Sequence, residues 1–178
     1  MSASSLEIIV IGLGDVAQTH LTVLEQIRNV DVVAGVDPAG SSAVTFRGRG
    51  IPVYKTVQDA GADHNPDVAV VATPTPTHAA VCSQVTESFP SARLLVEKPA
   101  AANLADARHV LGEIGRQQPV EVAYHMSCSP EVTWAMEIAR TKADSLGAPV
   151  AIEGSSLYQV GLVPAWRVDG GKIVSFTA

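Results

Sequence analysis

The stretch EIIVIGLGDVAQTH, residues 7–20, decides the fold that we predict for this chain. An apolar run suited to a buried strand comes first, two glycines one residue apart follow it, and a helical pattern begins at once. Glycine at the end of a strand suits a turn whose backbone comes close to a ligand, because glycine has no Cβ. Whether this turn binds a nucleotide depends on what the rest of the sequence supplies.

Composition limits the class of protein. The chain has 178 residues, of which 47% are hydrophobic and 17% are charged, so we expect one full globular domain and a smaller remainder. Its apolar runs are much shorter than the roughly 20 residues of a membrane span, and no secretory leader precedes the first run. We therefore expect a cytoplasmic protein without membrane contact. A net charge of -6 without clustered Lys or Arg argues against nucleic acid as a partner.

The two cysteines give no sign of a metal centre. Cys82 and Cys128 lie far apart, without a CxxC pair or a histidine at metal-ligand spacing. We expect two small buried thiols, no metal site and no disulfide framework.

Short runs rich in Val, Ile and Ala alternate with longer segments of helical spacing, which is typical of βαβ units around a buried parallel sheet. The predicted strands are 6–11, 31–36, 51–54, 67–72, 92–96 and 119–123, and the predicted helices are 15–28, 39–47, 56–63, 77–88 and 103–117. This order predicts an α/β fold with a doubly wound parallel sheet, the Rossmann fold. Its ligands bind at the carboxyl ends of the strands.

The last third of the chain differs in pattern. We predict a dinucleotide-binding domain over residues 1–125 and a linking helix, from 129 to about 143, at the start of a second part, 126–178. The run APVAIEGSSLYQV, residues 148–160, has strand composition but no partner strand in the sequence. Because an unsatisfied strand edge favours pairing between copies, we expect a homo-oligomer.

The order of residues around the glycine pair favours a dinucleotide. Gly12 follows a strand, Gly14 opens a helix, and Ala17 allows helix and strand to pack closely. A pyrophosphate needs backbone N–H groups at a helix N-terminus, and a Cβ at Gly14 would hold it away. The turn and the first helical residues, Gly12, Leu13, Gly14, Asp15 and Val16, are therefore candidate cofactor contacts.

Asp37 ends the second strand near the position expected for the carboxylate that binds ribose hydroxyls. A carboxylate accepts hydrogen bonds from a free 2′-hydroxyl and repels a 2′-phosphate, which favours NAD. Arg47 and Arg49 at the end of the next helix keep NADP possible, although cations near a helix C-terminus are the commoner explanation.

Three further segments end predicted strands: ATPTPTH at 72–78, EKP at 97–99 and AYH at 123–125. Each has an ordinary structural explanation alone. Their shared place at one sheet edge favours function, because a lysine there can exchange a proton with a hydroxyl or carbonyl that undergoes hydride transfer.

In this order, GLGDVAQTH, VDP, ATPTPTH and EKPAA resemble the glucose-fructose oxidoreductase / inositol dehydrogenase / MocA family of NAD(P)-dependent oxidoreductases. The resemblance implies that Lys98 is the catalytic proton donor or acceptor and that Glu97 lies beside the nicotinamide. It places Thr73, Pro74, Thr75, His78 and His125 at the cofactor site. Met126 and Ser127 stand where the family usually has arginines.

The resemblance implies hydride transfer between NAD, or NADP, and a small-molecule substrate: a sugar, a cyclitol or a related polyol. PAWRVDGGKI, residues 164–173, resembles the start of the family's second α/β domain, so we expect the chain to hold the cofactor half and only a short remnant of that domain. A non-catalytic nucleotide-binding regulatory or interaction module is the alternative, because family folds also serve regulators.

Overall fold

The computed structural model describes residues 5–40, 44–142, 147, 168–169 and 172–173. Contacts along the chain divide it into two compact units, Met1–Ala123 and Tyr124–Ala178.

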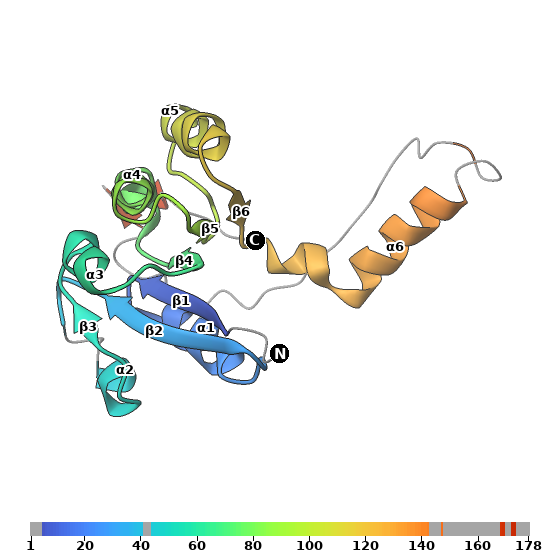
Figure 1. Cartoon of the computed structure of the whole chain (residues 1–178). Coiled ribbons are helices and arrows are strands. Elements are labelled where there is room, and N and C mark those ends of the chain that lie inside the picture. The colour runs from blue at the N-terminus through green and yellow to red at the C-terminus, as the bar shows by residue number, and fades with distance from the viewer. Residues whose placement is uncertain (1–4, 41–43, 143–146, 148–167, 170–171, 174–178) are drawn as a thin grey trace. The chain divides into compact units, whose positions relative to one another are not determined.

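The first unit is built on a parallel six-stranded sheet with the order β3-β2-β1-β4-β5-β6 (Figure 1). Its strands are β1 (Leu6–Ile11), β2 (Val30–Val36), β3 (Val53–Tyr54), β4 (Val68–Val71), β5 (Arg93–Val96) and β6 (Val120–Val122). The chain winds outward from β1 to β3 and then returns to place β4 on the other side of β1. This confirms the predicted doubly wound Rossmann fold, with its reversal point between β1 and β4.

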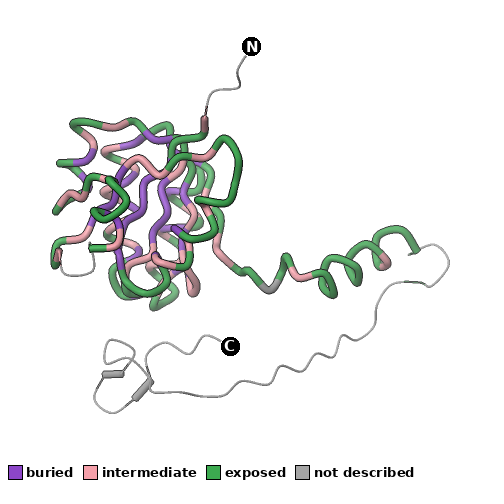
Figure 2. The backbone as a smooth tube through the Cα atoms, turned by 90° about the horizontal axis from the view of Figure 1, so that it is seen from below, coloured by how far each residue is buried: buried purple, intermediate pink, exposed green. Residues whose placement is uncertain are grey.

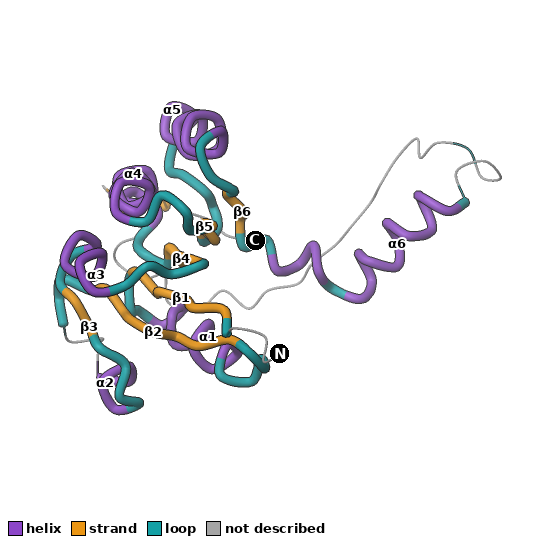
Figure 3. Tube along the Cα trace, in the orientation of Figure 1, coloured by secondary structure: helices purple, strands orange, loops and turns teal. Residues whose placement is uncertain are grey.

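Helices follow the strands, as Figure 3 shows. They are α1 (Asp15–Leu24), α2 (Val44–Gly48), α3 (Val57–Asp63), α4 (His78–Ser88) and α5 (Leu104–Ala107). A 3-10 turn, η2 (Thr75–Thr77), leads into α4. The stretch after α5 continues as a π turn, η3 (Arg108–Glu113), and a 3-10 turn, η4 (Ile114–Arg116).

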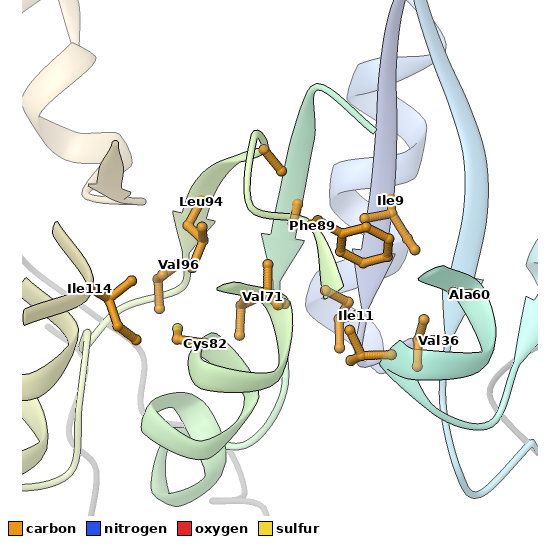
Figure 4. Close-up of a cluster of buried hydrophobic side chains, with 14 of the residues drawn as sticks. Ile9, Ile11, Val36, Ala60, Val71, Cys82, Phe89, Leu94, Val96 and Ile114 are labelled. Atoms are coloured by element: carbon orange, nitrogen blue, oxygen red, sulfur yellow. The ribbon is translucent and has the colours of Figure 1, made fainter. Parts of the chain in front are cut away.

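The sheet has an apolar core on each face, because its central strands carry buried residues at successive positions. Ile9 and Ile11 pack on the side of α3, α4 and the turns η3 and η4, around Phe89 (Figure 4). Ile8 and Val10 pack on the opposite side, with α1 and α2. Figure 2 shows the buried residues concentrated along the middle of this unit. Continuous apolar runs such as IIVI therefore form strands buried on both faces.

Two helices differ from the sequence prediction at their ends. α1 stops at Leu24 rather than 28, because Gln26 and Ile27 donate to carbonyls three residues back and Asn29 adopts a left-handed φ of 59°. The predicted helix 39–47 begins only at Val44, since Ala39 N–H donates to Asp37 Oδ1 in a turn; residues 41–43 lie outside the described part.

The second unit contains η5 (His125–Cys128) and α6 (Pro130–Thr141), whose N-terminus is capped by Ser129 Oγ accepting from Val132 N–H. Two-residue strands β7 (Val168–Asp169) and β8 (Lys172–Ile173) pair antiparallel. The β-like run 148–160 lies outside the described residues.

One cysteine differs from expectation. Cys82 is buried, and burial raises the pKa of its thiol to about 12. Cys128 is exposed, because it lies in the short turn η5 rather than against the core of the sheet.

Candidate functional site

The candidate site residues of the first unit lie along one edge of the sheet because four neighbouring strands end in register. Val36, Ile11, Val71 and Val96 form a single row across β2, β1, β4 and β5. The ladder continues one residue further: Gly12, Ala72 and Glu97 each donate their backbone N–H to the last carbonyl of a neighbouring strand, at 2.8–2.9 Å. The glycine turn at 12–14, the segment ATPTPTH at 72–78 and the EKP segment at 97–99 therefore follow the ends of neighbouring strands.

Gly12 lies where the loop after β4 comes closest to the loop after β1. Its φ is +83°, and a Cβ built on it would lie 2.8 Å from Ala72 C, Ala72 O and Thr73 Cα. Real Cβ atoms do not approach backbone this closely, so no side chain fits here. The first glycine is required by the fold itself at the point where the strand order reverses.

Gly14 has a different environment. It is the N-cap of α1, its φ of -69° is open to any residue, and no atom lies within 4 Å of a Cβ built on it. No side chain of its own or of a neighbour caps the first N–H groups of α1 at this position. The second glycine therefore leaves open space at a helix N-terminus, as an anion bound to the backbone requires.

Asp37 is tied directly to the glycine turn. Leu13 N–H donates to Asp37 Oδ2 at 3.0 Å, and Ala39 N–H donates to Oδ1 at 2.8 Å. Leu13 is also held through its carbonyl, which accepts from Gln18 Nε2 at 3.0 Å. Each carboxylate oxygen of Asp37 has a further lone pair, so Asp37 can hold the turn and still accept from ribose hydroxyls.

The two arginines that kept NADP possible have different surroundings. Arg49 forms an ion pair with Glu25 beyond the end of α1. Arg47 lies in the last turn of α2, where a cation favours the helix dipole.

Glu97 is paired with a histidine that sequence reasoning had not assigned to the site. His20 Nε2, on α1, lies 2.8 Å from Glu97 Oε1, and the two side chains are only 22% and 17% exposed. Lys98 N–H donates to the other oxygen, Oε2, at 3.1 Å. Burial acts to raise the pKa of Glu97, but the hydrogen bonds from His20 and Lys98 N–H and the charges of both residues outweigh it and hold this pKa below its usual value.

We expect Glu97→Gln to lower the free energy of unfolding by about 1–2 kcal/mol near pH 7, since the carboxylate accepts charge-assisted hydrogen bonds. A carboxyl whose pKa is lowered by folding stabilises the fold above its unfolded value, here 4.5, and loses that contribution as pH falls through the folded value. The difference between wild type and variant should therefore shrink below about pH 4.5 in thermal unfolding from pH 7 to 3. A difference that is constant over this range would contradict the assignment, and Glu113→Gln, at the exposed pair with His109, serves as control.

Thr75 and His78 lie inside the unit rather than at its surface. Thr75 is 5% exposed and His78 is 1% exposed. His78 Nε2 lies 2.8 Å from Thr73 O, and Nδ1 lies 3.1 Å from Pro99 O. Their place at the cofactor site therefore stays a prediction, with both side chains buried in this structure. Thr73 and Pro74 are not buried, and Thr73 Oγ1 accepts from Thr77 Oγ1 at 2.9 Å.

Lys98 is half-buried, and its preceding residue Glu97 and following residue Pro99 both have side-chain contacts from helices. Among the residues that the structure describes, the Lys98 ammonium has no hydrogen-bond or ion-pair partner. His125 is exposed and belongs to the second unit, so its contact with the cofactor stays a prediction.

Ser83, His109 and Glu113 have triad-like contacts. Ser83 Oγ lies 2.8 Å from His109 Nε2, and His109 Nδ1 lies 2.7 Å from Glu113 Oε2. Ser83 lies within α4 and donates to Ala79 O, so the backbone N–H groups around it serve the helix rather than an oxyanion. We interpret this cluster as a link between α4 and η3.

The described residues contain no group of three or more His, Cys, Asp or Glu side chains placed to hold a metal ion. The same part of the chain has no helix with the length and apolar character needed to cross a membrane.

Comparison with known proteins gives the family of this chain. The GFO_IDH_MocA family model, described as an oxidoreductase family with an NAD-binding Rossmann fold, matches residues 6–124. The chain belongs to this family. The predicted resemblance is thereby confirmed for the part that holds the glycine turn, Asp37 and the EKP segment.

Among curated proteins, this family member is 26% identical over 124 residues to the rhizopine catabolism protein MocA of Rhizobium meliloti, covering 68% of this chain and 38% of MocA. Among solved structures, it is similar to scyllo-inositol dehydrogenase of Lactobacillus casei with bound NAD(H) and scyllo-inositol, with a TM-score of 0.68, 14% identity and coverage of 80% and 43%.

The WlbA dehydrogenase of Bordetella pertussis, in complex with NADH and UDP-GlcNAcA, gives a TM-score of 0.70 at 16% identity and coverage of 79% and 43%. At such identities the structures show a shared fold. The chain spans about two fifths of the length of these relatives.

His20 and Gln18 are the site residues that sequence reasoning missed. Both lie on α1 within two turns of the glycines, but nothing in the sequence indicates that His20 faces a residue 77 positions away. The available signal was local: Ala17 and Leu21 mark the buried side of α1, and His20 lies three residues after Ala17, next to that side.

Proposed function

We propose that this chain binds NAD and is the cofactor-binding part of a dehydrogenase that transfers a hydride between the nicotinamide and a hydroxyl-bearing carbon of a sugar, cyclitol or related polyol. The observation that carries the proposal is the open space at Gly14, at the N-terminus of α1, within the same turn that Asp37 holds through Leu13 N–H. Neither the φ of Gly14 nor its packing requires a glycine, and its place at a helix N-terminus without a side-chain cap supports a ligand that approaches the backbone.

The residues present fit a dinucleotide. The Gly12–Gly14 turn and the first turn of α1, with Asp15 and Val16, would hold the pyrophosphate through backbone N–H groups. Asp37 would accept from the ribose hydroxyls. Thr73 and Pro74, at the neighbouring strand end, would line the path toward Lys98, while Thr75 and His78 support that turn from inside.

Lys98 would hold or release the proton of the substrate hydroxyl. The nicotinamide, when bound, supplies the hydride acceptor or donor. The unpartnered ammonium of Lys98 among the described residues supports the acid/base role, because a lysine already committed to an ion pair exchanges its proton less readily. Glu97, paired with His20, would place a fixed negative charge beside that lysine.

The substrate class rests on the relatives. The scyllo-inositol dehydrogenase and WlbA structures were determined with an inositol and a UDP-sugar respectively. The family consists of oxidoreductases, which favours an enzyme over a non-catalytic nucleotide-binding module. A homo-oligomer in the cytoplasm is part of the same proposal.

Cofactor titration tests the proposal. We expect the chain to bind NADH at least about tenfold more tightly than NADPH, because the Asp37 carboxylate would repel a 2′-phosphate, and two unit charges at about 4 Å interact by several kcal/mol even at an effective dielectric of 20. Asp37→Asn keeps an oxygen that can accept from Leu13 N–H and removes the charge, so it should bring the two affinities to within about threefold. Isothermal titration with both cofactors measures the ratio.

Two results would contradict the proposal. Absence of NADH binding by the folded wild-type chain would remove the nucleotide site altogether. Equal wild-type affinities for NADH and NADPH would show that Asp37 does not distinguish a ribose 2′-hydroxyl from a 2′-phosphate. Glu25→Gln, which releases Arg49, is the control for a phosphate contact from the segment directly after α2.

A further inference from the structure

We propose that His20 and His78 are positioning residues that fix the backbone of Lys98 from its two sides, one through Glu97 and the other through Pro99. The role of Lys98 itself rests on the proposed function, whereas the positioning of its backbone does not. The inference comes from the contacts of two histidines that lie on different helices and converge on one three-residue segment.

The first side is held through both oxygens of Glu97. Oε1 lies 2.8 Å from His20 Nε2, and Oε2 accepts from Lys98 N–H at 3.1 Å. The Glu97 carboxylate therefore joins α1 to the backbone of Lys98. Helix α1 is itself fixed against the core by Ala17 and Leu21, which are fully buried.

The second side is held through the carbonyl of Pro99. His78 Nδ1 lies 3.1 Å from Pro99 O, while Nε2 lies 2.8 Å from Thr73 O. Carbonyl oxygens only accept, so either neutral tautomer donates to one of them and the doubly protonated ring donates to both. His78 thus links the loops after β4 and β5. With 1% exposure, the ring is surrounded by protein rather than by solvent.

The arrangement leaves the Lys98 side chain as the movable part. Its backbone neighbours are held at both ends, whereas its ammonium has no partner among the described residues. A proton donor must stand within hydrogen-bond reach of the reacting atom, and a displacement of about 1 Å can reduce the rate by about 100-fold. Holding the backbone limits the positions that a flexible four-carbon side chain can reach.

A purely structural role for the histidines makes a different prediction. Loss of packing alone would weaken the whole unit, so amides throughout the sheet would exchange faster to the same degree. Loss of positioning would act locally, at the amide of Lys98, while amides of the central strand β1 such as Val10 keep their exchange rates.

Amide hydrogen exchange of the folded 178-residue chain, followed by NMR at 25 °C, distinguishes these roles. We expect His20→Ala and His78→Ala each to accelerate exchange of the Lys98 amide at least tenfold relative to that of Val10. His20→Gln, whose amide nitrogen can still donate to Glu97, should restore the rate to within about threefold of wild type. His109→Ala is the matched control, because His109 also pairs with a glutamate but lies at η3.

An unchanged Lys98 amide in both alanine variants would overturn the proposal, and so would equal acceleration at Lys98 and Val10. If an alanine variant does not fold, His20→Gln, His78→Gln and His78→Leu provide the comparison. A chemical shift and exchange rate of the Lys98 amide that are identical to wild type in His78→Leu but not in His78→Gln would also overturn the proposal. NADH titration of the same samples separates the two proposals. Local acceleration without NADH binding leaves the positioning intact and rejects the proposed function, whereas NADH binding without local acceleration does the reverse.

Discussion

Gly12→Ala should lower the free energy of unfolding by about 2–5 kcal/mol. The residue has a φ of +83°, which costs an L-residue about 1–3 kcal/mol, and the added Cβ would lie 2.8 Å from three backbone atoms of Ala72 and Thr73. Backbone cannot yield as the end of a flexible side chain can, so β1 and β4 would have to separate. Urea unfolding followed by circular dichroism measures the loss, which is a large share of the stability of a typical domain.

Gly14→Ala is the matched control for this experiment. Its φ of -69° suits alanine and its Cβ would meet no atom within 4 Å, so we expect the free energy of unfolding to change by less than about 0.5 kcal/mol. NADH affinity should nevertheless fall at least about tenfold, because the methyl group would occupy the space for the pyrophosphate. Equal stability losses in the two variants would show that the close approach of the β4 loop does not restrict residue 12.

Lys98→Met should lower the turnover rate at least about 100-fold in an enzyme that joins this unit to a substrate-binding domain, because it removes the acid/base group. Methionine keeps most of the length and apolar surface of the lysine side chain, so cofactor affinity should change by less than about threefold. Steady-state kinetics with inositols and aldoses, together with NADH titration, measure both quantities.

Lys55→Met is the control for Lys98→Met. Lys55 directly follows β3, at the same edge of the sheet, and is exposed. Its replacement should leave turnover within about twofold of wild type. Near-normal turnover of Lys98→Met would remove Lys98 from the catalytic role, whereas an equal loss in both variants would point to a general effect of charge at this edge.

The strands, and their place in a doubly wound parallel sheet, could be predicted from the sequence because the alternation of strands and helices is a local pattern. Runs such as IIVI at 8–11 and VAVV at 68–71 have no polar side, which is typical of strands buried on both faces. The segments that connect successive strands are long enough for right-handed crossovers, and this rule allows few arrangements of a parallel sheet.

The ends of the helices could not be predicted as well, because they depend on hydrogen bonds that several residue types can make. The turn after Leu24 ends α1 before the predicted residue 28. The hydrogen bond from Ala39 N–H to Asp37 forms a turn where the spacing of apolar residues predicted the start of a helix. The stretch 103–117 is helical as expected, but it changes from α to π to 3-10 geometry along its length.

The sequence by itself determined which residues reach the site edge: Gly12, Gly14, Asp37, Thr73 and Lys98 all follow strands, and parallel strands end at the same edge. Only the tertiary structure decided what each one does there. It distinguishes a glycine that the β4 loop requires from one that leaves open space, and it turns His78 inward onto two carbonyls. It also brings His20 to Glu97 across 77 residues of chain. Such contacts depend on how α1 and α4 pack against the sheet, and that packing is set by the whole core rather than by residues near either partner in the sequence.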